Sequence, residues 1–140
     1  MAVIDTVPGI KVDIKSNGAT LPEYDDAEGR LGSINRVFDR DIRPKQDKLS
    51  STFIECISDS EFSISMEVDP RFDLGSGAMG LSFWCIVDGK RIGGHTVHRK
   101  KLHTRYECVI SETWGRVSPT EVMMKKLKFA AIQKGTCFRE

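Results

Sequence analysis

The chain has 140 residues, of which 39% are hydrophobic and 29% charged, with a formal net charge of +1 at pH 7. This composition is typical of a globular protein with a real core, and it excludes full-length disorder. No apolar run approaches the roughly 20 residues of a membrane span, and the acidic start lacks the basic region of a secretory signal. We therefore expect residues 1–140 to form a single domain in the cytoplasm or nucleus, without membrane contact.

Charge is distributed unevenly along the chain. Acidic residues outnumber basic ones in residues 1–73, and the reverse holds in residues 74–140. Such polarity indicates either a basic binding face or acidic and basic strands that lie side by side. The second interpretation is favoured, because opposite charges pair readily across antiparallel strands.

The four cysteines are widely spaced and form no C-x-x-C motif. In a reducing compartment, this spacing favours free thiols over disulfides. Cys56, Cys85 and Cys108 stand in apolar, strand-like runs, so we expect them to be buried as small hydrophobic residues. Cys137 is expected to be the exposed one.

Residues 1–58 contain two strand patterns separated by loops. Ile10–Lys15 alternates apolar and charged residues, which predicts a half-buried strand closed by a turn at Ser16–Gly18. Residues 21–29 predict an acidic loop, and residues 30–51 a long polar loop. A second strand is predicted over Thr52–Ile57.

Glu61–Val68 carries the clearest periodicity in the chain. Apolar and polar residues alternate with a period of two, which predicts a strand with one wet face. Pro70 ends this strand, because proline donates no hydrogen bond to a ladder. Residues 75–80 are rich in glycine and predict a flexible connection.

Leu81–Val87 is apolar on both faces, and Asp88-Gly89 after it is typical of a two-residue type I′ hairpin turn. Lys90–Val97 is therefore predicted to be the returning strand, and its two glycines indicate a bulge or a close backbone approach. Trp84 and Ile86 lie on the face opposite the core residues, and this face needs a cover. Segment 30–51, a partner protein or a second copy of the chain would supply it.

The last third of the chain gives conflicting signals. Arg105–Trp114 predicts one strand that ends near Gly115. Ser118–Glu121 is a capping box with proline at the first helical position, which predicts a short helix over residues 119–134. Lys126–Ile132 also begins with alternation, which favours a strand. The short, regularly spaced strands predict an all-β, antiparallel β-sandwich of jelly-roll-like architecture, with this helix as the open alternative.

Five short motifs occur in a familiar order along the chain. They are Val7–Val12, Leu21–Asp26, Phe53–Ile57 with Glu61–Ile64, Phe83–Gly94 and Leu127–Ile132. In this order the chain resembles a family of fungal domains of unknown function, found in intracellular proteins of filamentous fungi. The resemblance implies a β-rich domain with the Asp-Gly hairpin near its centre. It also implies a strand at 127–132 in which Leu127 and Phe129 point inward, and it brings no activity or functional residues.

No catalytic motif stands out, so we expect no enzyme activity, no catalytic residues, no cofactor and no metal. The sequence has no nucleophile elbow, no P-loop and no zinc-ligand spacing. His95, His98 and His103 lie close together in sequence. On a strand, however, His95 and His98 would point to opposite faces, which does not suit a shared metal.

Two functions are consistent with these patterns. The first is an intracellular protein–protein interaction module, self-associating or with a protein partner, in which Trp84 and Ile86 form the interface. The alternative is binding of nucleic acid or another polyanion by a basic patch from segments 98–105 and 125–128. Its candidate residues are Arg99, Lys100, Lys101, Arg105, Lys125, Lys126 and Lys128. The near-neutral net charge and the scarcity of nearby aromatic residues favour the first function.

Overall fold

A computed structural model describes residues 2–3, 8–25, 52–88 and 90–130. These residues form eleven β-strands and one 3₁₀ turn, and the described part contains no α-helix. In chain order the elements are β1 Ala2–Val3, β2 Ile10–Ser16, β3 Ala19–Thr20, β4 Glu23–Asp25, β5 Thr52–Ile54, β6 Phe62–Val68, β7 Gly80–Val87, β8 Lys90–His98, η3 Arg99–Lys101, β9 Tyr106–Ile110, β10 Glu112–Arg116 and β11 Val122–Lys126. The prediction of an all-β, antiparallel fold is confirmed. The predicted loop at 30–51 and Cys137 lie outside the described residues.

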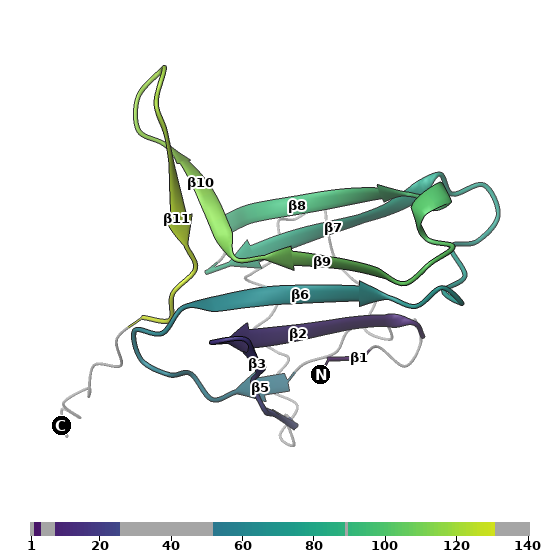
Figure 1. Ribbon diagram of the computed structural model, residues 1–140, viewed down its shortest axis with the longest axis horizontal. Helices are drawn as coiled ribbons and strands as arrows, with labels where there is room; N and C mark the ends of the chain where they lie inside the picture. Colours follow the sequence, from purple (N-terminus) through teal and green to yellow (C-terminus); the bar gives the residue numbers. More distant parts are fainter. Residues whose placement is uncertain (1, 4–7, 26–51, 89, 131–140) are drawn as a thin grey trace, which may run out of the picture.

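The larger sheet has the order β1-β2-β6-β9, with β3 paired to the end of β2 (Figure 1). The alternation predicted for β2 and β6 places their apolar residues on the same face, since Ile14 lies opposite Ile64, and Ile64 opposite Ile110. The predicted turn after β2 is confirmed. Asn17 and Gly18 have φ values of 51° and 80°, as a type I′ turn requires.

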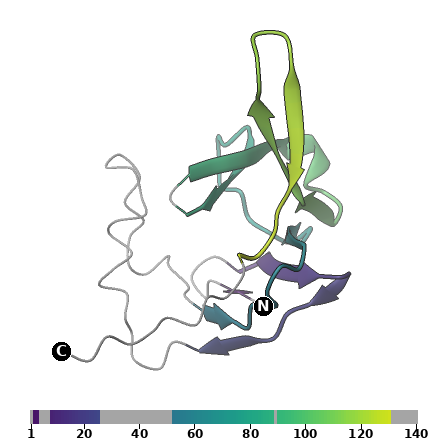
Figure 2. The same cartoon turned by 90° about the vertical axis from the view of Figure 1, so that its left-hand side faces the viewer.

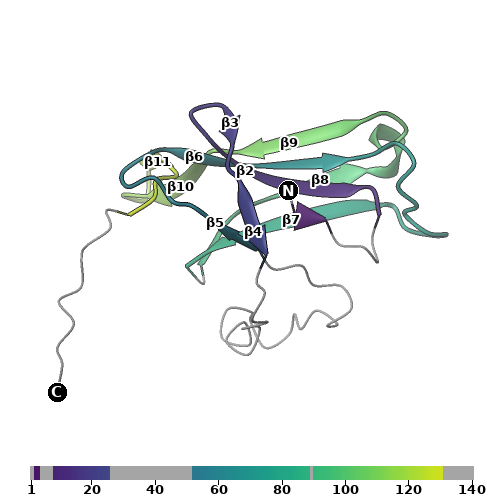
Figure 3. The same cartoon turned by 90° about the horizontal axis from the view of Figure 1, so that it is seen from below.

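The β7–β8 hairpin forms a second layer against the apolar face of this sheet (Figure 3). The core between the layers centres on Val68 of β6, Val97 of β8 and Leu102, all buried. Partly buried residues surround this cluster: Phe72, Leu74, Leu81, Phe83 and Tyr106. Cys85 is buried as predicted, and burial raises the pKa of its thiol. The larger sheet and β7–β8 thus form a two-layer sandwich whose second layer is a single hairpin.

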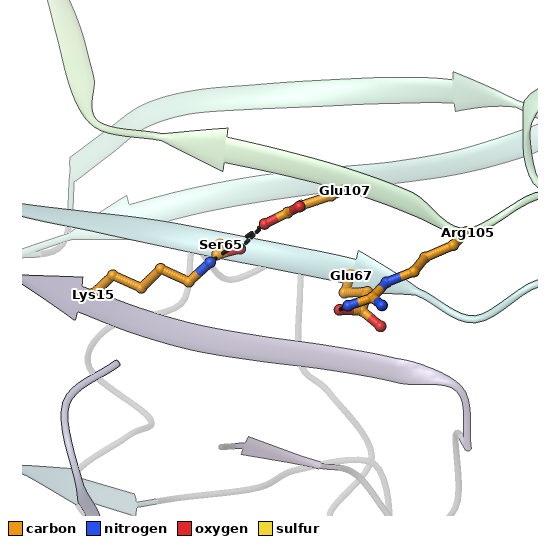
Figure 4. Close-up of polar contacts among 5 residues, drawn as sticks. All are labelled: Lys15, Ser65, Glu67, Arg105 and Glu107. Atoms are coloured by element: carbon orange, nitrogen blue, oxygen red, sulfur yellow. Dashed lines mark hydrogen bonds and ion pairs between the residues drawn. The ribbon is translucent and has the colours of Figure 1, made fainter. Parts of the chain in front are cut away.

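The opposite face of the larger sheet is polar and carries paired charges (Figure 4). Ser65 Oγ donates to Glu107 Oε1 at 2.9 Å, and Lys15 Nζ lies 3.3 Å from the same oxygen. These two hydrogen bonds lower the pKa of Glu107. Arg105 forms a salt bridge with Glu67, so a basic residue of the second half of the chain pairs with an acidic residue of the first half. The pairing agrees with acidic and basic strands that lie side by side.

The loop prediction for residues 21–29 is wrong over its described part, and the strand at Thr52–Ile57 is shorter than predicted. β4 lies in this segment and pairs with β5, which ends at Ile54. Cys56 therefore lies beyond the strand and is exposed, so the prediction that it is buried is also wrong. A three-residue strand such as β4 has too few residues to show an alternation.

The prediction of one strand over Arg105–Trp114 is wrong, because the chain leaves the sheet at Ser111. β9 ends at Ile110, the residue before it. Beyond that point Leu127, and not β9, lies next to β6. Leu127 N donates to Ser111 O at 2.9 Å, and Phe62 N donates to Leu127 O at 3.0 Å. The single strand is thus divided into β9, within the sheet, and β10, outside it.

The predicted helix at 119–134 is absent from the described part of this segment. Residues 118–121 form a turn in which Glu121 N donates to Ser118 O at 3.3 Å, and β11 then pairs with β10. Backbone pairing across this hairpin outweighs the local capping signal. The strand implied at 127–132 is not found over its described part, where only an isolated bridge joins Lys128 to Glu61. Leu127 is nevertheless buried, as the resemblance implied, and the Phe129 ring stacks on Phe62 at 4.5 Å between centroids.

Candidate functional site

The predicted interface residues lie on the outer face of the β7–β8 hairpin. Trp84 pairs with Gly94 across the hairpin, and the Arg91 guanidinium lies 2.9 Å from the centroid of the indole. Trp84 is 51% exposed, and Ile86 is half-buried. The hairpin thus covers part of this face itself, through a cation–π contact.

The glycines of the returning strand have the roles predicted for them. The register between β7 and β8 shifts between Cys85 and Ile86, which marks a bulge beside Gly93. Gly94 allows a close approach: a Cβ atom there would lie 2.8 Å from Cε3 of Trp84. The absence of a side chain at Gly94 therefore lets the indole lie flat over the neighbouring strand.

The strands β10 and β11, with the turn between them, project from the sandwich as a two-stranded arm (Figures 1 and 2). We call residues 112–126 the arm. Its root is anchored by Leu127 in the core and by a hydrogen bond of 3.3 Å from Thr113 Oγ1 to the carbonyl oxygen of Ile92 on β8. Two-stranded hairpins are only marginally stable alone, so this anchoring holds the arm in place.

The arm has two faces that differ in composition. Residues directly opposite each other in an antiparallel pair share a face. One face, which we call the outer arm face, carries Glu112, Trp114, Arg116, Val122, Met124 and Lys126. The other face carries Thr113, whose bond to Ile92 turns that side toward β8. The outer arm face therefore points away from β8.

The arm holds a concentration of exposed apolar side chains. They are Trp114, Val117, Val122, Met123 and Met124. Trp114 is 69% exposed, although tryptophan is among the most hydrophobic residues in a protein. Sequence reasoning missed this surface, since it assigned Trp114 to a sheet strand and placed Val122–Met124 within the predicted helix. The matching lengths of Glu112–Arg116 and Val122–Lys126 on either side of Ser118-Pro119 were the available signal.

The candidate basic residues do not form one patch. Arg99, Lys100 and Lys101 lie on η3 at one end of the sheet, and β11 lies at the other end (Figure 1). Three of the seven are engaged within the chain. Arg99 donates to the carbonyl oxygens of Gly75 and Ala78, Arg105 pairs with Glu67, and Lys126 with Glu61. The remaining four, Lys100, Lys101, Lys125 and Lys128, have no salt bridge with a described residue.

The η3 end of the molecule contains a shallow hollow of about 610 Å³. Its lining consists of Gly77, Ala78, Met79, His98, Arg99, Lys100, Lys101 and His103. No acidic residue is among them, so the hollow concentrates positive charge. Arg99 fixes its wall, because its guanidinium lies 2.9 Å from the carbonyl oxygen of Gly75.

The three histidines do not come together. His95 stacks on Tyr106 with the ring centroids 5.9 Å apart, whereas His98 and His103 both line the hollow at η3. Within the described ranges, no group of three or more His, Cys, Asp or Glu side chains has the geometry to hold a metal ion. The described residues also include no helix of the length and apolarity that a membrane crossing requires.

The architecture is an all-β sandwich with a projecting arm. A comparison with known protein families identifies the family to which the chain belongs. The chain belongs to the DUF7918 family, a domain of unknown function, whose match covers residues 9–137. No curated protein and no solved structure matches the chain. The expected resemblance to a domain-of-unknown-function family is thereby confirmed.

Proposed function

We propose that the chain is a non-enzymatic protein–protein interaction module and that the outer arm face is its binding surface. The observation that carries the proposal is the exposed cluster of Trp114, Val122 and Met124 on a projecting, anchored hairpin. Contiguous apolar surface of this kind marks interaction sites in soluble proteins. Tryptophan at the centre is the residue type that most often dominates interface energies.

The partly covered face of β7–β8 is a weaker candidate. Arg91 already lies over Trp84, so a partner there would have to displace or accept this cation–π contact. On the arm, no described residue makes an equivalent contact with Trp114. We therefore place the interaction surface on the arm, with Trp84 and Ile86 as a secondary contact.

Two neighbouring methionines provide a matched test. Met124 lies on the outer arm face and is 50% exposed, and Met123 lies on the opposite face and is 46% exposed. The test uses a partner that is captured with the wild-type chain, identified and purified. The affinity between this partner and the chain should fall at least about tenfold in the Met124→Thr and Trp114→Thr variants. The partner should keep its affinity for Met123→Thr. Equal binding by all variants would overturn the proposal.

The finer placement of the protein is also a proposal. The motif order that resembles fungal domains supports a fungal, intracellular protein, and the sequence favours the cytoplasm or the nucleus. Localisation of the tagged full chain in a filamentous fungus tests this placement. A secreted product would contradict it.

A second candidate function is binding of nucleic acid or another polyanion at the η3 hollow. The specific observation in its favour is a lining with several basic side chains and no acid. Charge reversal of Lys100 and Lys101 should abolish the binding of a fluorescent single-stranded oligonucleotide, and salt should weaken it steeply. Reversal of Lys125 and Lys128, which are also exposed and lie at the other end of the molecule, is the control. If binding depended equally on both pairs, the hollow would not be the site.

A further inference from the structure

We infer that the partner of the outer arm face is a second copy of this chain, packed face to face with its arm pointing in the opposite direction. The inference rests on the proposed function, because it names the occupant of that surface. It is carried by the order of charges along the outer arm face and by a hollow at the root of the arm.

The outer arm face consists of three levels of cross-strand pairs. From root to tip they are Glu112 with Lys126, Trp114 with Met124, and Arg116 with Val122. Lys126 is already held by Glu61, with Nζ 2.8 Å from Oε2. Glu112 and Arg116 form no salt bridge with a described residue. Glu112 lies opposite Lys126 and, after Glu61, also raises the pKa of that lysine. One lysine thus has two carboxylates near it at the root, which is negative overall, whereas the centre of the face is apolar and its tip carries the available positive charge of Arg116.

This order is complementary to itself when one copy is reversed. A two-fold axis that runs across the arms, in the plane of contact, lays β10 of one copy antiparallel over β10 of the other. Trp114 then lies over Trp114 of the other copy, and each Arg116 lies over the Glu112 of the other copy. Such isologous contacts are the commonest in soluble oligomers, and every charge pair occurs twice in them. Met124 fills the centre beside the indoles, as a flexible side chain that adapts to irregular gaps.

The second observation is a hollow of about 400 Å³ at the root of the same face. Lys15, Glu61, Glu112 and Lys126 are among the residues that line it, together with the turn at Asn17-Gly18. In the reversed arrangement, the tip of the second arm points toward this hollow. Ser118, Pro119 and Thr120 at that tip are small, so the turn fits a shallow depression. The hollow thus extends the contact beyond the three levels of side chains.

The size of the contact sets the expected affinity. Each arm strand has five residues, which corresponds to a length of about 17 Å. Such a contact buries less than the roughly 1,200 Å² of a standard stable interface, so the dimer should be weak and concentration-dependent. We expect a dissociation constant in the micromolar range or above.

Two charge reversals test the arrangement: Arg116→Glu and Glu112→Arg. Each variant alone places two like-charged pairs in the symmetric dimer. In an equimolar mixture, a heterodimer has one native pair and one pair of introduced, opposite charges. Sedimentation velocity from about 1 µM to about 1 mM should show weakening of at least about tenfold for each variant alone, with recovery in the mixture. A merely structural role of either residue would not produce recovery on mixing.

Each outcome has a defined meaning. A wild-type chain that remains monomeric over this range would overturn the second copy as partner but leave the proposed interaction surface standing. Association that both variants weaken without recovery on mixing would overturn the reversed arrangement. If Met123→Thr weakened association as much as Met124→Thr, both the inference and the proposed surface would be wrong. Melting temperatures of all variants confirm that the arm remains folded.

Discussion

The β7–β8 hairpin and the arm are both antiparallel hairpins with a central tryptophan, but they differ in how much of their surface the rest of the chain covers. In β7–β8 one face is buried in the core and Arg91 covers the tryptophan of the other face. In the arm, all five residues of β11 are exposed, and only the root reaches the core. The comparison teaches that similar local patterns give a core layer or an exposed surface according to what the rest of the chain places against them.

Two valines give the largest expected difference between the hairpins. Val97 of β8 is 1% exposed, and Val122 of β11 is 56% exposed. Val97→Ala should lower the free energy of unfolding by about 2–3 kcal/mol, because it removes two buried methyl groups and leaves a cavity. Val122→Ala should change it by less than about 0.5 kcal/mol. Urea denaturation of both variants measures the two values, and equal losses would mean that the arm is packed in solution.

Two glycines sharpen the comparison. A Cβ atom at Gly94 would lie 2.8 Å from the indole of Trp84 and 2.9 Å from the carbonyl oxygen of Phe83, whereas at Gly115 the nearest atom is 3.9 Å away. Gly94→Ala should therefore cost about 1–3 kcal/mol through overpacking. Gly115→Ala should be neutral or slightly stabilising. Thermal unfolding separates the two, and a neutral Gly94→Ala would contradict the close packing of Trp84.

The two tryptophans should separate stability from association. Trp84→Ala removes the contact with Arg91 and the packing over Gly94, so we expect a loss of about 1–2 kcal/mol. Trp114→Ala should leave the free energy of unfolding within about 0.5 kcal/mol of the wild type and weaken association. Chemical denaturation and sedimentation, run on both variants, distinguish the roles. If Trp84→Ala weakened association and Trp114→Ala lowered the free energy of unfolding, the proposed binding surface would lie on β7–β8 and not on the arm.

The smallest expected effect is a pH dependence that belongs to the sandwich and not to the arm. Side-chain and backbone hydrogen bonds from Arg71 lower the pKa of Asp69 from 3.8 to about 2. The folded state therefore favours the charged carboxylate, and its contribution to stability is complete above pH 3.8 and lost as the pH falls toward 2. Melting temperature against pH should decline less steeply in this window for Asp69→Asn. An identical decline would mean that other carboxylates control acid unfolding.

The strands with strong periodicity could be predicted from the sequence alone. β2, β6 and β7–β8 carry alternation or an Asp-Gly turn within a single segment, so local rules suffice for them. β4 could not be predicted, because its pairing with β5 joins segments far apart in the sequence. The division between β9 and β10 depends on Leu127, which replaces β9 beside β6 only in the folded chain.

The same limit applies to the candidate site. Trp84 was identified because it lies within one periodic segment, although Arg91 partly covers it. Trp114 was missed because its exposure follows from the departure of the chain at Ser111. The matching lengths of the two arm segments indicate a hairpin, but they do not indicate that it lies outside the sheet. The capping box at Ser118–Glu121 was misleading, since the same residue types that start helices also form turns.

The exchange of strands at the root of the arm also bears on how the domain can evolve. Ser111 and Leu127 close the sheet beneath the arm through their own hydrogen bond, so the sandwich does not depend on the length of what lies beyond them. Insertion or deletion of two residues in each strand would change the reach of the arm and keep the same residues on its outer face, whereas a change of one residue in each strand would turn them to the other face. The geometry thus allows the reach of the arm to change by two residues per strand with no change to the body of the domain.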